Sequence, residues 1–522
     1  MVLLLFFTER GDSYLMKNKT LFGVCGGVKS CVEAAGRGAD YVDLHFKTEE
    51  ELIEALGKAG ELGIGIVANL EGQPLDWVPS PKLRSVLEGN NAFLGFMLDE
   101  CDHMQLNAHW PVIEYYGYKG KHYFADTDGM DLDRAQEAVE GAIRERVKAL
   151  TIDGKDVAGE YLYPGMMHTA ARAGLSASPK ILKETCGPVM IAAALGASLQ
   201  YGGTFGIDCD AWWHPESVGH TDERFASALK LAYYAGADRI YIEGGFGACG
   251  HPSEVTQPWL LEQMAGKYAP AHIRNYSWRD YKPEVAVIRQ DDTCFDIRQR
   301  SPLEYPGPLY GHVPAGEENT EWLNILNLLS HGYVRNDSAS RNWECRSVLA
   351  RTLFAPFYKL VIFDETVKEE LLTGIRLFFL TGLKISRQTY QAVTQKVREG
   401  SVCVAPQRFA PEKFQKEFQK ENKDEPVSVV EDGAGKWMIV KDFYSLHYET
   451  WTSGPCNPVL HRELMPLIGD GDTLVYEFGN SLVRASLKKK PVGKGKVYPC
   501  NEIPRALWEA EDDMEFMVEE RV

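Results

Sequence analysis

The chain has 522 residues, 44% of them hydrophobic, and its 74 acidic residues outnumber 56 basic ones, which leaves a net charge of -18. At roughly 150 residues per domain, this length predicts two to four domains. The negative charge argues against nucleic acid or an anionic membrane as the main partner, because both attract basic surfaces. Neutral or cationic ligands fit better.

Eleven cysteines are present without a C-x-x-C pair, which argues against a zinc ribbon or a thioredoxin-type motif. The odd number, mostly within apolar runs, favours a reduced, cytoplasmic protein. The opening "MVLLLFFTER" has six apolar residues after its Met, no basic region before them and no small-residue cleavage site, so we expect no signal peptide. No stretch reaches the ~18 apolar residues of a membrane span.

Four short β-type runs open the chain, at 21–27, 39–46, 63–71 and 93–100. Helical patterns lie between them; in the stretch 48–63, leucines and alanines recur on one helical face. Strands that alternate with helices at this spacing are typical of a parallel sheet joined by crossovers.

The same alternation returns after a longer excursion, with a strand predicted at 204–212, a helix at 221–237 and another strand at 238–245. We take these two strands as the sixth and seventh of a barrel, with the fifth at 166–174 and the eighth after residue 265. Six or seven such units over about 260 residues predict an α/β fold, a (β/α)8 TIM barrel spanning 1–280.

Two further domains are predicted after the barrel. Strands at 282–292, 358–365 and 400–406, with helical runs between them, indicate a smaller α/β domain over 281–426 with its own parallel sheet. Short alternating runs after the charged stretch 411–426 predict a small antiparallel β domain over 427–522.

Acids at the carboxyl ends of barrel strands are functional candidates, because TIM-barrel active sites lie at that end. They are Glu71, Asp99, Glu100, Asp208, Asp210 and Glu243. Asp208 and Asp210 are separated by one residue, so both point the same way and can bind substrate, although a structural ion pair explains them equally well. Aromatic and histidine residues follow closely, namely His103, Trp212, Trp213 and His214. Sugar rings stack on indole faces, but Trp212 and Trp213 fit a core or interdomain contact just as well.

Hydrolysis of a glycosidic bond needs two carboxyl groups, one to protonate the leaving oxygen and one to attack the anomeric carbon or activate water. Glu100 and Glu243 end two strands that stand apart around the barrel, so they suit these roles. Either acid taken alone fits a helix cap or an ion pair as well. The acid-rich "DTDGMDLD" at 126–133 lacks the spacing of a calcium loop and favours a helix start.

With these residues, the chain resembles the retaining glycoside hydrolases that carry the acid/base on the fourth strand and the nucleophile on the seventh. More narrowly, the domain order resembles the family 42 β-galactosidases, in which the barrel precedes a glutamine-amidotransferase-like (flavodoxin-like) domain and a small β domain. The resemblance implies Glu100 in "FMLDE" as acid/base and Glu243 in "IYIEGG" as nucleophile. The asparagine that precedes the family's acid/base is Asp99 here, and the zinc-binding cysteines of some members have no counterpart.

The sequence therefore predicts a retaining, exo-acting glycosidase that needs no cofactor or metal and acts on an oligosaccharide or glycoside. The second domain, whose "SVCVAP" lacks a nucleophile elbow, is expected to assemble a dimer or trimer. Two alternatives stay open. One is an inverting hydrolase or a lyase that pairs Glu100 with Asp208 or Asp210, and the other is a sugar-binding barrel without chemistry.

Overall fold

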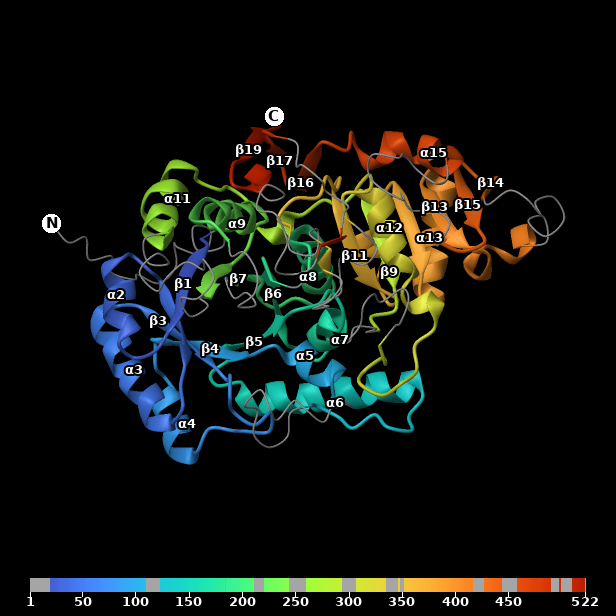
Figure 1. The fold of residues 1–522 in the computed structure, drawn as a ribbon. Coiled ribbons are helices and arrows are strands. Elements are labelled where there is room, and N and C mark those ends of the chain that lie inside the picture. The colour runs from blue at the N-terminus through green and yellow to red at the C-terminus, as the bar shows by residue number, and fades with distance from the viewer. Residues whose placement is uncertain are drawn as a thin grey trace.

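The computed structural model describes residues 19–108, 123–183, 185–210, 220–243, 260–292, 307–334, 346–347, 352–415, 427–443, 458–489, 497–498 and 509–521. The described residues form four sheets: the barrel comes first, a six-stranded sheet lies beside it, and a three-stranded and a two-stranded sheet complete the fold (Figure 1). Within the described residues, none of the helices combines the length and apolar character that crossing a bilayer requires.

The barrel is closed by eight parallel strands in sequential order, and the last strand pairs with the first. This confirms the predicted TIM barrel. The strands are β1 (Leu21–Gly26), β2 (Tyr41–His45), β3 (Gly65–Asn69), β4 (Phe93–Leu98), β5 (Asp156–Tyr161), β6 (Ser176–Ile181), β7 (Gly206–Asp210) and β8 (Arg239–Glu243).

Helices follow the strands and cover the outside of the barrel (Figure 1). They are α2 (Ser30–Gly36), α3 (Glu49–Leu62), α4 (Pro81–Leu87), α5 (Cys101–Leu106), α6 (Leu132–Leu150), α7 (Met167–Arg172), α8 (Gly187–Tyr201) and α9 (Asp222–Tyr234). Local sequence sets their ends. The Thr48 side chain caps α3, and Gly63 ends it with a φ of 71° that favours glycine. Asp131 caps α6, so the acid-rich stretch is a helix start, as predicted.

Two strand predictions in the second half of the barrel are wrong. Residues 166–174, predicted as the fifth strand, contain helix α7, and the fifth strand is β5, further upstream. The strand predicted after residue 265 is not the eighth, because β8 already closes the barrel against β1. The predicted sixth and seventh strands are therefore β7 and β8, and β6 was missed. The region after 260 instead holds a π-helix, Glu262–Tyr268, and the short α11 (Ala269–Ala271).

The second sheet has the strand order β11-β9-β12-β13-β15-β14. Its strands are β9 (Val285–Arg289), β11 (Leu360–Asp364), β12 (Leu377–Thr381), β13 (Val402–Pro406), β14 (Val427–Asp432) and β15 (Gly435–Val440). All are parallel except β14, which pairs antiparallel with β15. Helices α12 (Glu321–Leu329) and α13 (Arg387–Glu399) accompany it. The sheet continues beyond residue 426, whereas the domain boundaries themselves remain predictions.

A small antiparallel sheet ends the chain, as expected, with β16 (Thr473–Phe478), β17 (Ser481–Leu487) and β19 (Met514–Glu520). Helix α15 (Pro458–Ile468) precedes it. A separate two-stranded pair joins β10 (Arg346–Ser347) to β18 (Val497–Tyr498).

Helix α8 joins the barrel to the second sheet. It is buried along the first twelve of its fifteen residues, and it packs against β11. A Cβ atom on Gly196 would lie 1.7 Å from the carbonyl oxygen of Ile362, so only glycine permits this close approach. The ring Nε2 of His168 donates to the same carbonyl oxygen at 3.0 Å.

Buried polar contacts, here called the interface network, strengthen this junction. Asp364 at the end of β11 accepts from Arg172 Nη2 at 2.6 Å and from Gln200 Nε2 at 2.7 Å, and it also accepts from the Tyr201 hydroxyl. The backbone N–H of Thr169 donates to Asp291 at 2.7 Å. Burial opposes the charge of Asp364, but His168, Arg172 and these hydrogen bonds outweigh it and lower its pKa to about 2.

Candidate functional site

The carboxyl ends of the barrel strands meet at one end of the barrel, here called the mouth. All eight strands, or the turns directly after them, supply polar side chains there: Cys25, Asp43, His45, Asn69, Glu71, Asp99, Glu100, Glu160, Lys180, Lys183, Asp208, Asp210, Tyr241 and Glu243. Most of these are buried or partly buried. Because buried ionisable groups are costly to keep, their concentration at one end marks the mouth as the functional candidate.

Lys180 on β6 lies at the centre of the mouth with only 1% of its side chain exposed. Its ammonium nitrogen is within 3.6 Å of five carboxylates: Glu243 at 2.5 Å, Glu160 at 3.0 Å, Asp210 at 3.3 Å, Glu100 at 3.4 Å and Asp208 at 3.6 Å. Burial opposes its charge, but these carboxylates outweigh burial and hold the pKa of Lys180 well above its usual value. Lys180 is therefore a fixed cation.

A second lysine reinforces the same side of the mouth. Lys183 contacts Glu100 at 2.5 Å and Asp210 at 2.8 Å. Backbone strain accompanies these contacts, since Glu100 has a φ of 36° and Leu182 a φ of 76°. Non-glycine residues in this region persist only where the surroundings enforce them, and they cluster at functional sites.

The carboxyl groups in the mouth differ in their affinity for protons. Burial and the nearby charge of Glu243 raise the pKa of Asp208 well above its usual value, and they raise that of Asp210 as well. Burial, followed by Glu160, has the same effect on Asp99. For Glu100, Lys183 and Lys180 outweigh burial and hold the pKa well below its usual value. The mouth therefore contains carboxyls poised in opposite protonation states.

A deeper layer of hydrogen bonds holds Glu160. The amide nitrogen of Asn69 donates to Glu160 and to Asp43, both at 3.0 Å, and the Tyr241 hydroxyl also donates to Glu160. These groups come from β2, β3, β5 and β8, so they tie opposite sides of the barrel together. Such support fixes the carboxylates above it in position.

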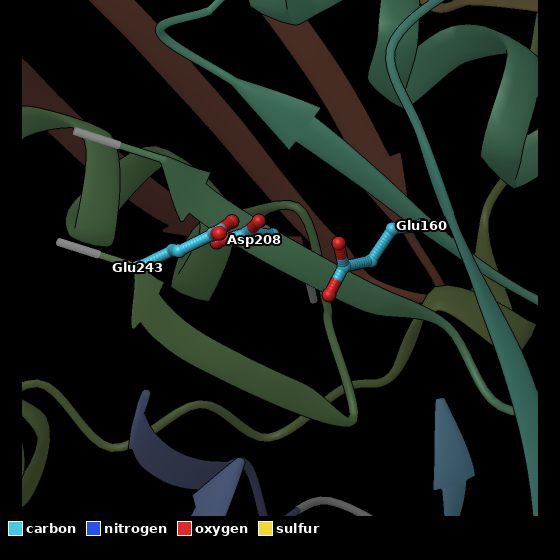
Figure 2. Close-up of side chains that lie close together, drawn as sticks. All are labelled: Glu160, Asp208 and Glu243. Carbon is cyan, nitrogen blue, oxygen red and sulfur yellow. The ribbon is translucent and has the colours of Figure 1, made fainter. Parts of the chain in front are cut away.

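Glu160, Asp208 and Glu243 each offer a carboxylate oxygen within 4.8 Å of the other two. Figure 2 shows the carboxyl groups of Asp208 and Glu243 next to each other and Glu160 facing them from the neighbouring part of the barrel. Oxygen ligands at this spacing suit a divalent cation. Here the ammonium of Lys180 contacts all three, so the chain itself supplies the balancing positive charge.

The first three strands form a different wall of the mouth. Cys25 at the end of β1 has its sulfur 3.6 Å from Nε2 of His45 on β2. Nδ1 of His45 lies 2.5 Å from a carboxylate oxygen of Glu71, and Nε2 lies 3.5 Å from Asp43. A thiol, an imidazole and a carboxylate thus follow one another on three neighbouring strands.

Several predicted site residues come together in the mouth. Glu100, Glu243, Asp208 and Asp210 all contact Lys180. Asp99 is buried, and His103 on α5 is close enough to Glu100 to help lower its pKa. Glu243 lies on β8, so its predicted place on the seventh strand is wrong. Trp212, Trp213 and His214 lie outside the described residues.

Sequence reasoning missed Glu160, Lys180 and Lys183. The runs "DVAGEY" and "SASPKI" that form β5 and β6 contain charged residues, proline and glycine, which weaken the strand pattern. Their position could have identified Glu160 and Lys180 as site candidates, because each is the penultimate residue of a short run between helical patterns. His45 and Cys25 stand at strand ends that were predicted correctly and were not assigned a role.

No protein-family model matches the chain, and no curated protein does, so sequence comparison gives no support to family 42. Among solved structures, the exo-β-1,4-mannosidase Op5Man5 from Opitutaceae bacterium strain TAV5 aligns over 81% of this chain and 92% of its own, with 12% identity and a TM-score of 0.42. The HpcH/HpaI aldolase from Desulfitobacterium hafniense DCB-2 covers 45% of this chain and 90% of its own, with 13% identity and a TM-score of 0.26. The deoxyribose phosphate aldolase from Aeropyrum pernix covers 48% and 90%, with 17% identity and a TM-score of 0.28. Likenesses this distant do not distinguish among these activities.

Proposed function

We propose that the chain is a retaining glycoside hydrolase whose catalytic pair is Glu100 and Glu243. One observation carries the proposal. An oxygen of Glu100 lies 3.4 Å and an oxygen of Glu243 lies 2.5 Å from the same lysine nitrogen, so these two oxygens are at most about 5.9 Å apart, the sum of the two distances. Retaining pairs are separated by about 5–5.5 Å, and inverting pairs by about 6.5–9.5 Å.

Accessibility supports the same pair. The side chains of Glu100 and Glu243 are 13% and 16% exposed, whereas those of Glu160, Asp208 and Asp210 are fully buried. Of the five carboxyl groups around Lys180, these two glutamates are therefore the ones that a ligand in the mouth can reach. This favours them over the alternative that pairs Glu100 with Asp208 or Asp210.

The local charges favour a reversal of the roles that the family resemblance implies. A general acid has to carry a proton, but the pKa of Glu100 is held well below its usual value by Lys183 and Lys180. An ionised carboxylate suits nucleophilic attack. We therefore assign the nucleophile to Glu100. Glu243 contacts Lys180 alone of the two lysines, whereas Glu100 contacts both, so we give the acid/base role to Glu243, which has to take up a proton before the first step.

In the first step, a Glu100 oxygen forms a bond to the anomeric carbon while the bond to the leaving oxygen breaks and Glu243 protonates that oxygen. In the second step, Glu243 accepts a proton from water, and the water oxygen displaces Glu100. Lys180 remains an ammonium group throughout, and its contacts offset the repulsion between the carboxylates around it. The same proposal includes an exo mode of action on an oligosaccharide or glycoside. It also includes a role for the amidotransferase-like domain in assembling a dimer or trimer.

A second candidate function is a carbon–carbon lyase that forms a Schiff base on a lysine. Its support is the pair of lysines that share Glu100 and Asp210 at the mouth. A Schiff-base lysine needs a neutral amine, and the carboxylates hold Lys180 in the ammonium form. We therefore rank this function below glycoside hydrolysis.

The test is a panel of α- and β-linked nitrophenyl glycosides, followed by trapping with the 2-deoxy-2-fluoro analogue of the best substrate and mass mapping of the labelled peptide. We expect turnover by the wild type and a fluorosugar ester on Glu100. Glu100→Gln and Glu243→Gln should each lose about a thousandfold or more in activity. The matched control is Glu61→Gln, an exposed acid on α3, which should keep full activity.

Other outcomes separate the alternatives. A label on Glu243 would restore the roles implied by the family resemblance. Turnover with inversion of the anomeric centre would contradict the retaining mechanism. The lyase would be favoured over the hydrolase if no glycoside of the panel is turned over and borohydride traps a carbonyl substrate on Lys180 or Lys183.

A further inference from the structure

We propose that Cys25, His45 and Glu71 form a reactive-thiol site at the mouth, in which Cys25 is covalently modified by small carbon electrophiles, His45 accepts its proton and Glu71 orients His45. The proposal does not depend on the glycosidase assignment, because it concerns the thiol itself. A nucleophile beside a base that is in turn held by a third group is the arrangement on which covalent catalysis and selective modification rest.

The geometry is set by three adjacent strands. Cys25 is the penultimate residue of β1, His45 ends β2, and Glu71 lies two residues after β3. The strands pair in parallel, so their carboxyl ends lie at the same end of the barrel; Cys25 pairs with Asp43, and His45 pairs with Asn69. The contacts of 3.6 Å between sulfur and Nε2, and 2.5 Å between Nδ1 and Glu71, follow the order nucleophile, base, orienting carboxylate.

The contact with Glu71 also selects the useful tautomer of His45. Carboxylates lie on both sides of the ring, with Glu71 2.5 Å from Nδ1 and Asp43 3.5 Å from Nε2, and the shorter contact favours the neutral tautomer that keeps its proton on Nδ1. In that tautomer the lone pair of Nε2, which lies 3.6 Å from the sulfur of Cys25, can accept the thiol proton. When Cys25 reacts, the thiol proton passes to Nε2. With iodoacetamide, the sulfur–carbon bond forms and the carbon–iodine bond breaks, and iodide leaves with the bonding electrons.

Access distinguishes Cys25 from the other cysteines in the described part of the chain. Cys25 is partly exposed, whereas Cys31, Cys101, Cys186, Cys209 and Cys403 are buried. This partial exposure gives a small electrophile access to the sulfur of Cys25.

The surrounding charges set the pH at which the site reacts. Burial raises the pKa of Cys25 to about 11, although His45 acts in the opposite direction. Burial lowers the pKa of His45, but Cys25, Asp43 and Glu71 outweigh it and hold that pKa well above its usual value. The imidazole is therefore protonated near neutral pH, and modification should accelerate as the pH rises and His45 becomes a base. Glu243 on β8 and Asp43 on β2 are the other charged groups that act on Cys25, and both raise its pKa.

Modification of Cys25 should also obstruct the carboxylate pair. Val24 on β1 lies opposite Ile242 on β8, and the next residues along these two strands are Cys25 and Glu243. An adduct on the sulfur therefore occupies space beside Glu243. Loss of ligand access is expected to follow the extent of labelling.

The test measures the rate of iodoacetamide labelling of the folded, full-length protein between pH 6 and 10, with the labelled cysteine identified by peptide mass. We expect Cys25 to be the fastest-labelled of the six cysteines named above and its rate to rise with pH. His45→Gln should slow labelling of Cys25 about a hundredfold at pH 9, the scale of a positioned general base, and Glu71→Gln should slow it less. Cys25→Ser should remove that label.

Lys29→Ala, an exposed residue in the next turn, serves as the matched control and should leave the rate unchanged. Unfolding midpoints of all variants show whether they are folded; if His45→Gln is not folded, Glu71→Gln gives the same test of the relay. Equal Cys25 labelling rates in the wild type, His45→Gln and Glu71→Gln would overturn the proposal. So would a Cys25 that reacts no faster than the buried cysteines.

Discussion

The mouth of the barrel and the interface network both bury charged side chains, but they balance those charges differently. In the interface network, Asp364 accepts five hydrogen bonds, one of them from the guanidinium of Arg172, and its pKa falls to about 2. In the mouth, five carboxyl groups surround the ammonium of Lys180, and burial and Glu243 raise the pKa of Asp208 well above its usual value. A buried charge that only stabilises the fold is fully matched, whereas a site for chemistry keeps acids in excess.

The largest loss of stability is expected when the central cation of the mouth is removed. Lys180→Met leaves five carboxylates facing one another without their shared partner, and loss of one side of a buried ion pair typically costs about 3–5 kcal/mol. We expect a free energy of unfolding lower by that amount, measured in urea at pH 7, and no catalytic activity. Unchanged stability would contradict the central role of Lys180.

The next largest effect is expected at the interface network. Asp364→Asn removes a carboxylate that the folded state holds ionised, which should cost roughly 2–3 kcal/mol at pH 7. The pKa of Asp364 is lowered, so its contribution is present above about pH 4 and is lost as the pH falls toward about 2. Acid titration of urea stability should therefore show a smaller decrease for Asp364→Asn than for the wild type. Parallel curves would refute this assignment.

The same substitution in the mouth should have the opposite sign. The pKa of Asp208 is raised, so the folded wild type holds a proton that the unfolded chain releases above about pH 4, and stability falls as the pH rises. Asp208→Asn removes that penalty and keeps the shape of the side chain. We expect a gain in stability over the wild type that grows from pH 4 to pH 7, with reduced activity. A loss at pH 7 similar to that of Asp364→Asn would show that both aspartates are ordinary structural ion pairs.

The smallest effect is expected at an exposed pair. Lys384 contacts Asp133 across the surface, with side chains 42% and 69% exposed. Lys384→Ala should change the free energy of unfolding by no more than about 0.5 kcal/mol, because solvent and salt screen such pairs. This variant sets the scale against which the three buried positions are judged by the same urea titration.

The barrel could be predicted from sequence because its first four strands are short, mostly apolar runs with helical patterns between them. The acids at the ends of β4, β7 and β8 could be found for the same reason, since their strands were recognisable. Strands β5 and β6 were missed because Glu160 and Lys180 interrupt their apolar pattern. Two residues of the candidate site thus make their own strands hard to recognise in the sequence. The local pattern and the requirements of the site conflict at these positions.

The second sheet was predicted as a separate unit, but its hairpin β14–β15 was assigned to the terminal β domain. Alternating residues indicate a half-exposed strand and do not specify which sheet the strand joins. β15 pairs in parallel with β13 through contacts distant in sequence, and only the folded chain reveals that choice. The reaction roles within the mouth depend on Lys183 and Lys180, whose positions sequence spacing does not provide.

The glycine contact between α8 and β11 bears on how this protein can be divided. Gly196 allows the helix backbone to touch the carbonyl of Ile362, and the helix is apolar on nearly all sides. A chain cut at residue 280 would keep α8 and lose the sheet that covers it, and the uncovered helix would favour aggregation. Engineering that treats the barrel as a transferable module should therefore retain β9 and β11, since the second sheet completes the core of the first.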